Sequence, residues 1–198
     1  MTEVLGTTED AIARGAALLR AGELVAFPTD TVYGVGIAAS RRDRLAAIFE
    51  LKNRPLDKRI PILVADLSRV TDFEVDARAL ALAGRFWPGA LTLVLPGADG
   101  TQAFRAPDHP VALALIRAAG PLLATSANRS DEPDTLGADE VLIAFARQQD
   151  ELAAVIDGGS VPGGIASTVV DLTAAPARVL REGPISREEL AGVVELAP

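Results

Sequence analysis

Apolar segments of two kinds alternate along this chain of 198 residues. Some carry apolar residues at intervals of three and four, which indicates helices with one buried face, and others are short continuous apolar runs, which indicate buried strands. Helices are predicted over residues 10–19, 43–49, 76–86, 110–119 and 138–148, with a last one after Ser186. Strands are predicted over residues 24–28, 60–64, 91–95, 122–125, 154–157, 167–171 and 177–180.

Residues suited to helix ends flank several of these segments. The spacing of a capping box occurs at three predicted helix starts, namely Thr7 with Asp10, Ser40 with Asp43 and Ser186 with Glu189. Gly22 follows the first helix, and Pro110 suits the first turn of the fourth. Helices interleaved with short apolar strands predict an α/β fold with helices on at least one face of a sheet. The length predicts a single domain over residues 1–198.

The composition restricts the chemistry more than the fold. Cysteine is absent and histidine occurs once, which excludes disulfides, thiolate metal sites, a cysteine nucleophile and a multi-histidine metal site. The N-terminal segment is acidic and lacks a signal-peptide pattern, and no apolar run approaches the roughly 20 residues of a membrane helix. We therefore expect a cytoplasmic protein with no membrane partner.

The charge balance is acidic, with a formal net charge of −8. Proteins that bind long nucleic acids usually present a basic surface, so we do not expect extensive direct nucleic-acid binding. Any basic site must be a local cluster within an acidic body. Such a cluster suits a small anion better than a duplex.

The segment PTDT, residues 28–31, ends the strand predicted at 24–28. Pro28 stops the strand, three polar residues follow, and glycines stand at positions 34 and 36. These residue types are typical of a tight turn. They also present hydroxyl groups to a ligand, so the pattern by itself leaves a structural turn and a binding loop open.

Three cations cluster in the segment LKNRPLDK, residues 51–58. Pro55 biases the preceding residue toward extended backbone, and alternate side chains of an extended segment point the same way, so Lys52 and Arg54 can converge. Arginine offers a planar fork for phosphate oxygens and lysine offers a point charge. Together with Lys58, this pair indicates an anion site, with a solvated basic loop as the alternative.

Polar residues also follow the strand predicted at 122–125, in the segment ATSAN. Thr125, Ser126 and Asn128 stand at its carboxyl end, where open α/β sheets bind ligands. Hydroxyl and amide groups both donate and accept hydrogen bonds. A turn with asparagine in left-handed geometry is the alternative interpretation.

Two further segments are uninformative by themselves. Ser167 opens a strand after a glycine-rich loop, and Arg181 ends the next strand.

His109 stands between Asp108 and Pro110 at a helix start, where we expect a structural role rather than that of a general base. The nucleophile elbow, the Walker motif and the Rossmann glycine motif are absent.

Taken together and in order, the motifs carry a resemblance that none of them carries alone. The chain contains, in this order, PTDTVYG, KNRPLDK, WPGALT, RAPDHP, TSANRS, STVVD and LREG. This ordered set closely resembles the YrdC family of threonylcarbamoyl-AMP synthases, over about residues 10–190. The resemblance implies a twisted mixed α/β sheet flanked by helices around a large basic cavity, as in YrdC-like and dihydroxybutanone-phosphate-synthase-like folds.

The resemblance also implies one reaction. L-Threonine, bicarbonate and ATP give threonylcarbamoyl-AMP and pyrophosphate, and the product supplies the threonylcarbamoyl group for an adenosine next to the anticodon of tRNA. Downstream tRNA threonylcarbamoyl-transfer proteins would complete the modification. Mg²⁺ is expected to arrive with ATP, without a metal site made of protein side chains alone.

The family motifs imply roles for residues of this sequence. For ATP, they imply binding by Lys52, Arg54, Lys58, Thr101, Ser126, Asn128 and Arg181, with Lys52 and Arg54 as the catalytic pair. For threonine, they imply contacts from Thr31, Arg105, Thr125 and Ser167, with Arg105 pairing the carboxylate. Several cations would offset the charge of ATP, so that positioning and electrostatics supply most of the acceleration.

Some positions depart from the family pattern. Leu63 stands where many relatives have a histidine near threonine, and Asp131 replaces a glycine that is common after SANxS. We expect the short, single-domain form, without the additional C-terminal domain of long members. Two rival interpretations stay open: a YciO-like paralogue of different or low activity, and a non-catalytic RNA-binding or ribosome-associated module.

Overall fold

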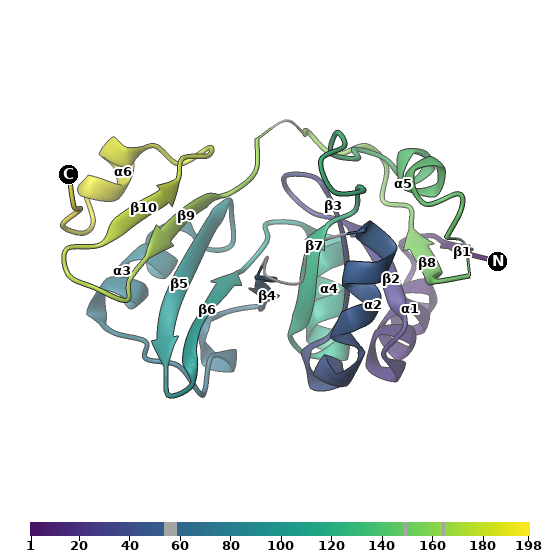
Figure 1. Cartoon of the computed structure of the whole chain (residues 1–198), viewed down its shortest axis with the longest axis horizontal. Helices are drawn as coiled ribbons and strands as arrows, with labels where there is room; N and C mark the ends of the chain where they lie inside the picture. Colours follow the sequence, from purple (N-terminus) through teal and green to yellow (C-terminus); the bar gives the residue numbers. More distant parts are fainter. Residues whose placement is uncertain (54–58, 149, 164) are drawn as a thin grey trace.

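A single twisted sheet runs through the molecule (Figure 1). The computed structural model describes residues 1–53, 59–148, 150–163 and 165–198. Its strands are β1 (Glu3–Leu5), β2 (Leu24–Pro28), β3 (Tyr33–Ala38), β4 (Ile62–Leu63), β5 (Leu91–Gly97), β6 (Gly100–Arg105), β7 (Leu122–Ser126), β8 (Leu152–Ile156), β9 (Thr168–Asp171) and β10 (Arg178–Arg181). Its helices are α1 (Glu9–Ala21), α2 (Leu45–Lys52), α3 (Ala77–Phe86), α4 (Pro110–Ala119), α5 (Ala138–Ala144) and α6 (Arg187–Ala191), with 3-10 helices η1 (Ala39–Arg44) and η2 (Leu67–Arg69).

The sheet is mixed and has the strand order β1-β8-β2-β3-β7-β4-β6-β5-β9-β10. The pairs β1/β8, β8/β2, β4/β6 and β5/β9 are parallel, and the other neighbours are antiparallel. Strand β4 lies between two groups of strands (Figure 1), where Ile62 pairs with Leu123 on one side and Phe104 on the other. The predicted α/β class, with a twisted mixed sheet flanked by helices, is confirmed.

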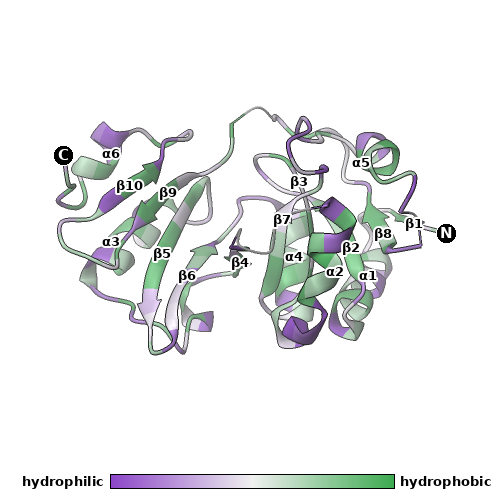
Figure 2. Ribbon diagram, in the orientation of Figure 1, coloured by the Kyte–Doolittle hydropathy of each residue, from purple (hydrophilic) through white to green (hydrophobic). Residues whose placement is uncertain are grey.

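Side-chain alternation decides which layer each strand residue joins, because successive residues of a strand face opposite sides of the sheet. In β2, Val25 and Phe27 pack with α1 and α4, whereas Leu24 and Ala26 belong to the cluster that includes α2, α3 and α5. Apolar residues accordingly concentrate in the strands and on the inner sides of these helices (Figure 2). The sheet therefore has an apolar layer on each side.

Most predicted elements are present, with corrections at some ends. Strand β2 and helix α4 have the predicted bounds. The N-cap of α1 is Thr8 rather than Thr7, because the Thr8 hydroxyl accepts a hydrogen bond from the Ala11 N–H at 3.4 Å. The second helix begins as η1, so the α-helical part starts at Leu45 and not beside Asp43.

Three strands were not predicted, namely β1, β3 and β6. Strand β3 contains glycines 34 and 36, which indicated tight backbone, because glycine in a strand weakens the local signal. Both β3 and β6 pair on both of their edges. Tertiary pairing therefore overrides a weak local preference in these segments. The apolar run at 60–64 contributes only the two residues of β4.

Candidate active site

One cavity collects most of the predicted site residues. Its volume is about 440 Å³, and its wall comes from the β2–β3 turn and from β4, β5, β6, β7, β9 and β10 with their flanking residues. Small-molecule sites commonly have volumes of about 300–1,000 Å³. The wall includes the predicted residues Thr31, Arg105, Thr125, Ser126, Ser167 and Arg181. Segments far apart in the sequence thus share one hollow, as the resemblance requires.

Two of the other predicted residues lie behind this wall. Lys52 and Asn128 are buried behind the β7 end of the wall, bonded to the segment that carries Ser126. Arg54 and Lys58 lie outside the residues that the structure describes. Their predicted roles at the phosphates stay predictions.

A second, larger cavity of about 520 Å³ opens on the other face of β6. Gln102 and Phe104 face it, whereas Ala103 and Arg105 alternate with them and face the first cavity. Of the predicted residues, the larger cavity contains Thr101. The smaller cavity is the better candidate, because hydroxyl and guanidinium groups converge there from several elements.

The PTDT segment forms both the turn and part of the wall. The Thr29 hydroxyl donates to the Val32 carbonyl at 2.6 Å, and the Thr29 N–H donates to the same carbonyl at 3.2 Å. These bonds close the connection between β2 and β3. The turn leaves the Thr31 hydroxyl in the cavity wall, 3.0 Å from a nitrogen of Arg105. The turn is therefore confirmed, and ligand binding by Thr31 stays a prediction.

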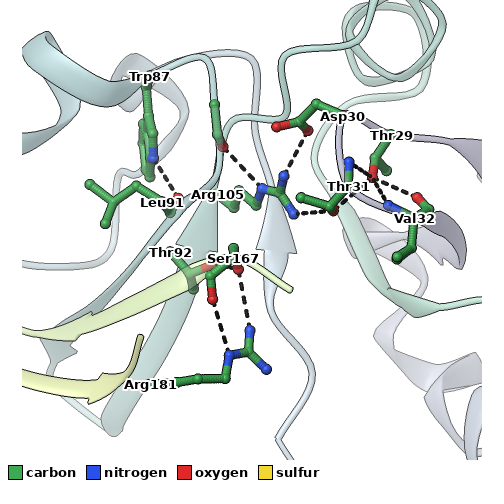
Figure 3. A network of polar contacts seen from close by, with 11 residues as sticks. Thr29, Asp30, Thr31, Val32, Trp87, Leu91, Thr92, Arg105, Ser167 and Arg181 are labelled. Carbon is green, nitrogen blue, oxygen red and sulfur yellow. Dashed lines mark hydrogen bonds and ion pairs between the residues drawn. The ribbon is translucent and has the colours of Figure 1, made fainter. Parts of the chain in front are cut away.

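Three hydrogen bonds hold the Arg105 side chain in the cavity wall (Figure 3). Its Nε donates to the Gly89 carbonyl at 3.1 Å, Nη1 to the Thr31 hydroxyl at 3.0 Å and Nη2 to the Asp30 carboxylate at 2.7 Å. The side chains of Arg105 and Asp30 are 10% and 15% exposed. A guanidinium has five N–H groups, and the described hydrogen bonds use three of them. With respect to these contacts, one N–H group on each terminal nitrogen can donate to a ligand.

Burial sets the electrostatics of this arginine. Desolvation lowers the pKa of Arg105 from its ordinary value, and the nearby charge of Arg181 acts in the same direction. The charge and hydrogen bond of Asp30 raise this pKa and so oppose the effect. An arginine stays protonated at neutral pH despite such shifts, so the cavity presents a desolvated cation that attracts an anion.

A second polar group, near Arg105, comes from β5, from the residue before β9 and from β10 (Figure 3). The Thr92 and Ser167 hydroxyl oxygens lie 2.8 Å apart. Arg181 donates from Nε to the Ser167 carbonyl at 3.0 Å and from Nη2 to the Ser167 hydroxyl at 3.3 Å. The predicted residues Ser167 and Arg181 therefore belong to one hydrogen-bonded group, and Thr92 is its third member.

The segment ATSAN is held from behind by hydrogen bonds. The Ser126 hydroxyl donates to Asn128 Oδ1 at 2.6 Å, and Asn128 Nδ2 donates to the Glu132 carbonyl at 2.6 Å. Lys52 Nζ donates to the Ser126 carbonyl at 2.5 Å and to Asn128 Oδ1 at 3.1 Å. The Asn128 side chain therefore organises the segment, while Ser126 and Thr125 reach the cavity.

Sequence reasoning missed several residues of the site. Arg59 and Asp134 line the cavity, and Asp30 supports Arg105 from behind. Arg59 donates to the Thr101 hydroxyl and, at 2.9 Å, to the Thr101 carbonyl, so Thr101 contacts the site through Arg59. Arg59 directly follows the basic segment LKNRPLDK, residues 51–58, and this adjacency is the sequence signal for it.

Both departures from the family pattern have a structural counterpart. Leu63 lies in the cavity wall, so an apolar side chain stands where the resemblance places a histidine near threonine. Asp131 has a φ of 66°, in the left-handed region that favours glycine. The turn after SANxS is therefore kept, and its hydrogen bond from the Glu132 N–H to the Arg129 carbonyl measures 3.1 Å.

His109 has the expected structural role. Its Nδ1 accepts a hydrogen bond from the Val111 N–H at 3.3 Å, which caps α4 and requires the neutral imidazole. Burial lowers the pKa of His109 below its ordinary value of 6.5, although the charges of Asp30 and Asp108 act in the opposite direction. The folded protein therefore favours neutral His109.

This cap predicts a pH-dependent stability. As the pH falls below about 6.5, the unfolded chain binds a proton at His109 before the folded chain does, so the free energy of unfolding decreases. Asparagine caps helices without titrating, so His109→Asn should show a smaller decrease. Urea unfolding of both proteins at about pH 7.5 and about pH 5.5 measures the difference. An identical decrease in both would exclude His109 as its source.

Neither a metal cluster nor a membrane span is found in the described part of the chain. Within it, no group of three or more His, Cys, Asp or Glu side chains is placed to hold a metal ion. No helix there has the length and apolar character needed to cross a bilayer.

Comparison with known proteins agrees with the fold and the motifs. The family model Sua5/YciO/YrdC, described as telomere recombination, matches residues 17–183, so the chain belongs to this family. The threonylcarbamoyl-AMP synthase of Bacillus subtilis is 41% identical over 210 residues, which is 98% of this chain and 59% of that protein.

Two solved structures give the same result in three dimensions. P. abyssi Sua5 complexed with L-threonine superposes with a TM-score of 0.91 at 37% identity, over 100% of this chain and 63% of that one. E. coli YciO superposes with a TM-score of 0.81 at 26% identity, over 93% and 97% of the two chains. The chain thus spans 59% of the Bacillus relative and 63% of Sua5.

Proposed function

We propose that this protein is an L-threonylcarbamoyladenylate synthase, a nucleotidyltransferase that forms threonylcarbamoyl-AMP and pyrophosphate from L-threonine, bicarbonate and ATP. One observation carries the proposal. Arg105 and Thr31, which the motifs assign to threonine, line the same cavity as Ser126 and Arg181, which the motifs assign to ATP. The likeness to a Sua5 structure that contains L-threonine, and to relatives named threonylcarbamoyl-AMP synthase, supports it.

The amino acid fits the end of the cavity at Arg105. The two remaining N–H groups of its guanidinium can receive a carboxylate, and charge-assisted bonds of this kind are about twice as strong as neutral ones. Thr31 and the Thr92–Ser167 hydroxyl pair supply neutral donors and acceptors nearby. Leu63 offers apolar surface for the threonine methyl group.

The nucleotide occupies the remaining wall in this proposal. Ser126 offers hydroxyl contacts beside the end of β7, and Arg181 and Arg59 offer guanidinium groups to phosphates. Arg54 and Lys58 add phosphate contacts according to the resemblance. Arginine forks match phosphate oxygens, so this set can hold a triphosphate without a nucleophilic side chain.

The chemistry then depends on positioning. The threonine amine and bicarbonate combine with loss of water to give N-carboxy-threonine. An oxygen of the new carboxylate attacks the α-phosphorus, the P–O bond to the β-phosphate breaks, and pyrophosphate leaves. Fixed cations offset the charge that develops on the leaving group, which is the main protein contribution in phosphoryl transfers of this type.

Mg²⁺ belongs to the nucleotide substrate in this proposal. The cavity wall carries the carboxylate of Asp134, and the Asp30 carboxylate pairs with Arg105. Phosphate oxygens and water are the ligands that Mg²⁺ prefers at such sites. The ion would therefore enter as Mg-ATP and neutralise phosphate charge there. The product would pass to proteins that transfer threonylcarbamoyl groups to tRNA.

A pyrophosphate assay tests the function. The purified protein is incubated with Mg-ATP, bicarbonate and L-threonine, and pyrophosphate release is measured with each component omitted in turn. We expect release only when threonine and bicarbonate are both present. Release that is indifferent to threonine would instead indicate a YciO-like paralogue. Salt-dependent RNA binding without any pyrophosphate release would indicate the RNA-binding module.

A further inference from the structure

Lys52 is buried although it carries a charge. It ends α2, and its side chain is among the largest fully buried ones, with the residue 1% exposed. Its Nζ donates to the Ser126 carbonyl at 2.5 Å, to Asn128 Oδ1 at 3.1 Å and to the Asn128 carbonyl. Its own carbonyl accepts from the Ser130 N–H at 3.0 Å. Side chain and backbone of Lys52 together bind both ends of the segment 126–130.

The number of donors limits what else this ammonium can do. An ammonium group has three N–H bonds, and three oxygens of the segment 126–130 surround it. A phosphate could receive one of these hydrogens only if one of the oxygens were released. A buried carbonyl without its partner is costly, so this exchange is unfavourable. Geometry thus directs Lys52 toward the protein rather than toward a ligand.

The choice of lysine is itself informative. Lysine occurs only twice among the 19 Lys and Arg residues of the chain, at positions 52 and 58. An ammonium is a compact centre whose three donors diverge, whereas the donors of arginine lie in a planar fork. Oxygens from Ser126 and Asn128 that surround a single point suit the ammonium. A chain that otherwise uses arginine almost throughout therefore keeps lysine where this geometry is needed.

The segment that Lys52 holds is the one that reaches the cavity. Ser126 lines the cavity with its neighbour Thr125, and the Ser126 hydroxyl donates to the same Asn128 Oδ1 that Lys52 binds. Without a cation, two carbonyls and an amide oxygen would face one another in a buried place. The ammonium therefore sets the direction in which the end of β7 presents its hydroxyl groups.

We propose that Lys52 is a positioning residue, which holds the segment 126–130 in the conformation that binds the nucleoside part of ATP and makes no contact with its phosphates. This inference rests on the proposed function and assigns Lys52 a role different from the phosphate contact that the family motif suggests. Replacement of Lys52 should lower the affinity for every ligand that contacts the segment 126–130, whether or not the ligand carries phosphates.

The test compares a nucleoside with its triphosphate. Lys52→Met keeps the length of the side chain and removes the charge. Titration calorimetry should show that the Kd values for adenosine and for Mg-ATP rise by the same factor, about tenfold. The Kd for L-threonine should rise by a smaller factor than the other two, since Arg105 lies on another element and only Thr125 adjoins the segment 126–130. Arg147→Met, at an exposed position after α5, is the matched control and should change none of the three.

Each outcome decides between the two roles. A loss for Mg-ATP that exceeds the loss for adenosine by about tenfold would assign a phosphate contact and overturn the proposal. Lys52→Arg keeps the charge but not the geometry of the donors, so it should lower the affinities for adenosine and Mg-ATP by the same factor. Near-normal binding of both ligands to this variant would also overturn the proposal. This variant decides the question if Lys52→Met does not fold. A wild-type protein that binds neither ATP nor threonine would instead contradict the proposed function.

Discussion

Replacing Arg105 with lysine is expected to raise the KM for L-threonine about a hundredfold, with a much smaller change in the KM for ATP. The Arg105 guanidinium donates three hydrogen bonds, to Gly89, Thr31 and Asp30. One further N–H group on each terminal nitrogen can donate to the carboxylate of threonine. An ammonium keeps the charge but has three donors in total, so it cannot make the internal bonds and also bind the carboxylate in a fork. Threonine-dependent pyrophosphate release at varied threonine and varied ATP measures the two constants separately.

Arg78→Lys is the matched control for this experiment. Arg78 also makes three hydrogen bonds, to Asp76, Ala174 and Leu172, but it lies on α3 away from the cavity. Both variants should lower the melting temperature, whereas the threonine KM should rise only in the Arg105 variant. Equal threonine constants in wild type and Arg105→Lys, with both proteins folded, would remove Arg105 from the threonine site.

Gly36→Ala is expected to lower the free energy of unfolding by about 3 kcal/mol, a large part of the roughly 5–15 kcal/mol that stabilises a domain. A Cβ at this position would lie 2.3 Å from the Leu123 carbonyl oxygen and 2.9 Å from the Ala124 Cβ. Strands β3 and β7 would have to separate, which would displace Thr125 of β7 relative to β3. Urea unfolding monitored by far-ultraviolet circular dichroism measures the effect.

Gly34→Ala provides the comparison within the same strand. A Cβ at Gly34 would meet its nearest neighbour, the Thr125 carbonyl oxygen, at 3.5 Å, and the Phe27 ring at 3.6 Å. These are ordinary contact distances, so this variant should stay within about 1 kcal/mol of the wild type. If the two variants lost the same stability, close approach of β7 could not be the reason for glycine at position 36.

Much of the candidate site was accessible from single segments of the sequence. Ser126 and Thr125 follow an apolar run at the carboxyl end of a strand, where α/β sheets place ligands. Thr31 stands after a strand stopped by proline, and the order of the motifs assigned Arg105, Ser167 and Arg181. The structure places these residues around one cavity.

Other parts of the site depend on contacts that no local pattern records. The pairing of Asp30 with Arg105 joins a turn after β2 to the end of β6, 75 positions along the chain. The ammonium of Lys52 meets the carbonyl of Ser126, 74 positions away. Charge and spacing within one segment cannot show which distant oxygen a cation will meet, so the motif indicated a ligand contact and left the internal contact of Lys52 unpredicted.

The amino-acid order alone determined the α/β class, the bounds of elements such as β2 and α4, the helix-cap position of His109 and the polar residues that follow the strands. These follow from periodicity, helix capping and strand-end chemistry, which act over a few residues. Folding in three dimensions decided that β3 and β6 are strands. It also decided which cations line the cavity, and that Arg59 and Asp134 are part of its wall. Those outcomes depend on burial and hydrogen-bond partners supplied by remote segments, and burial exists only once the chain has packed.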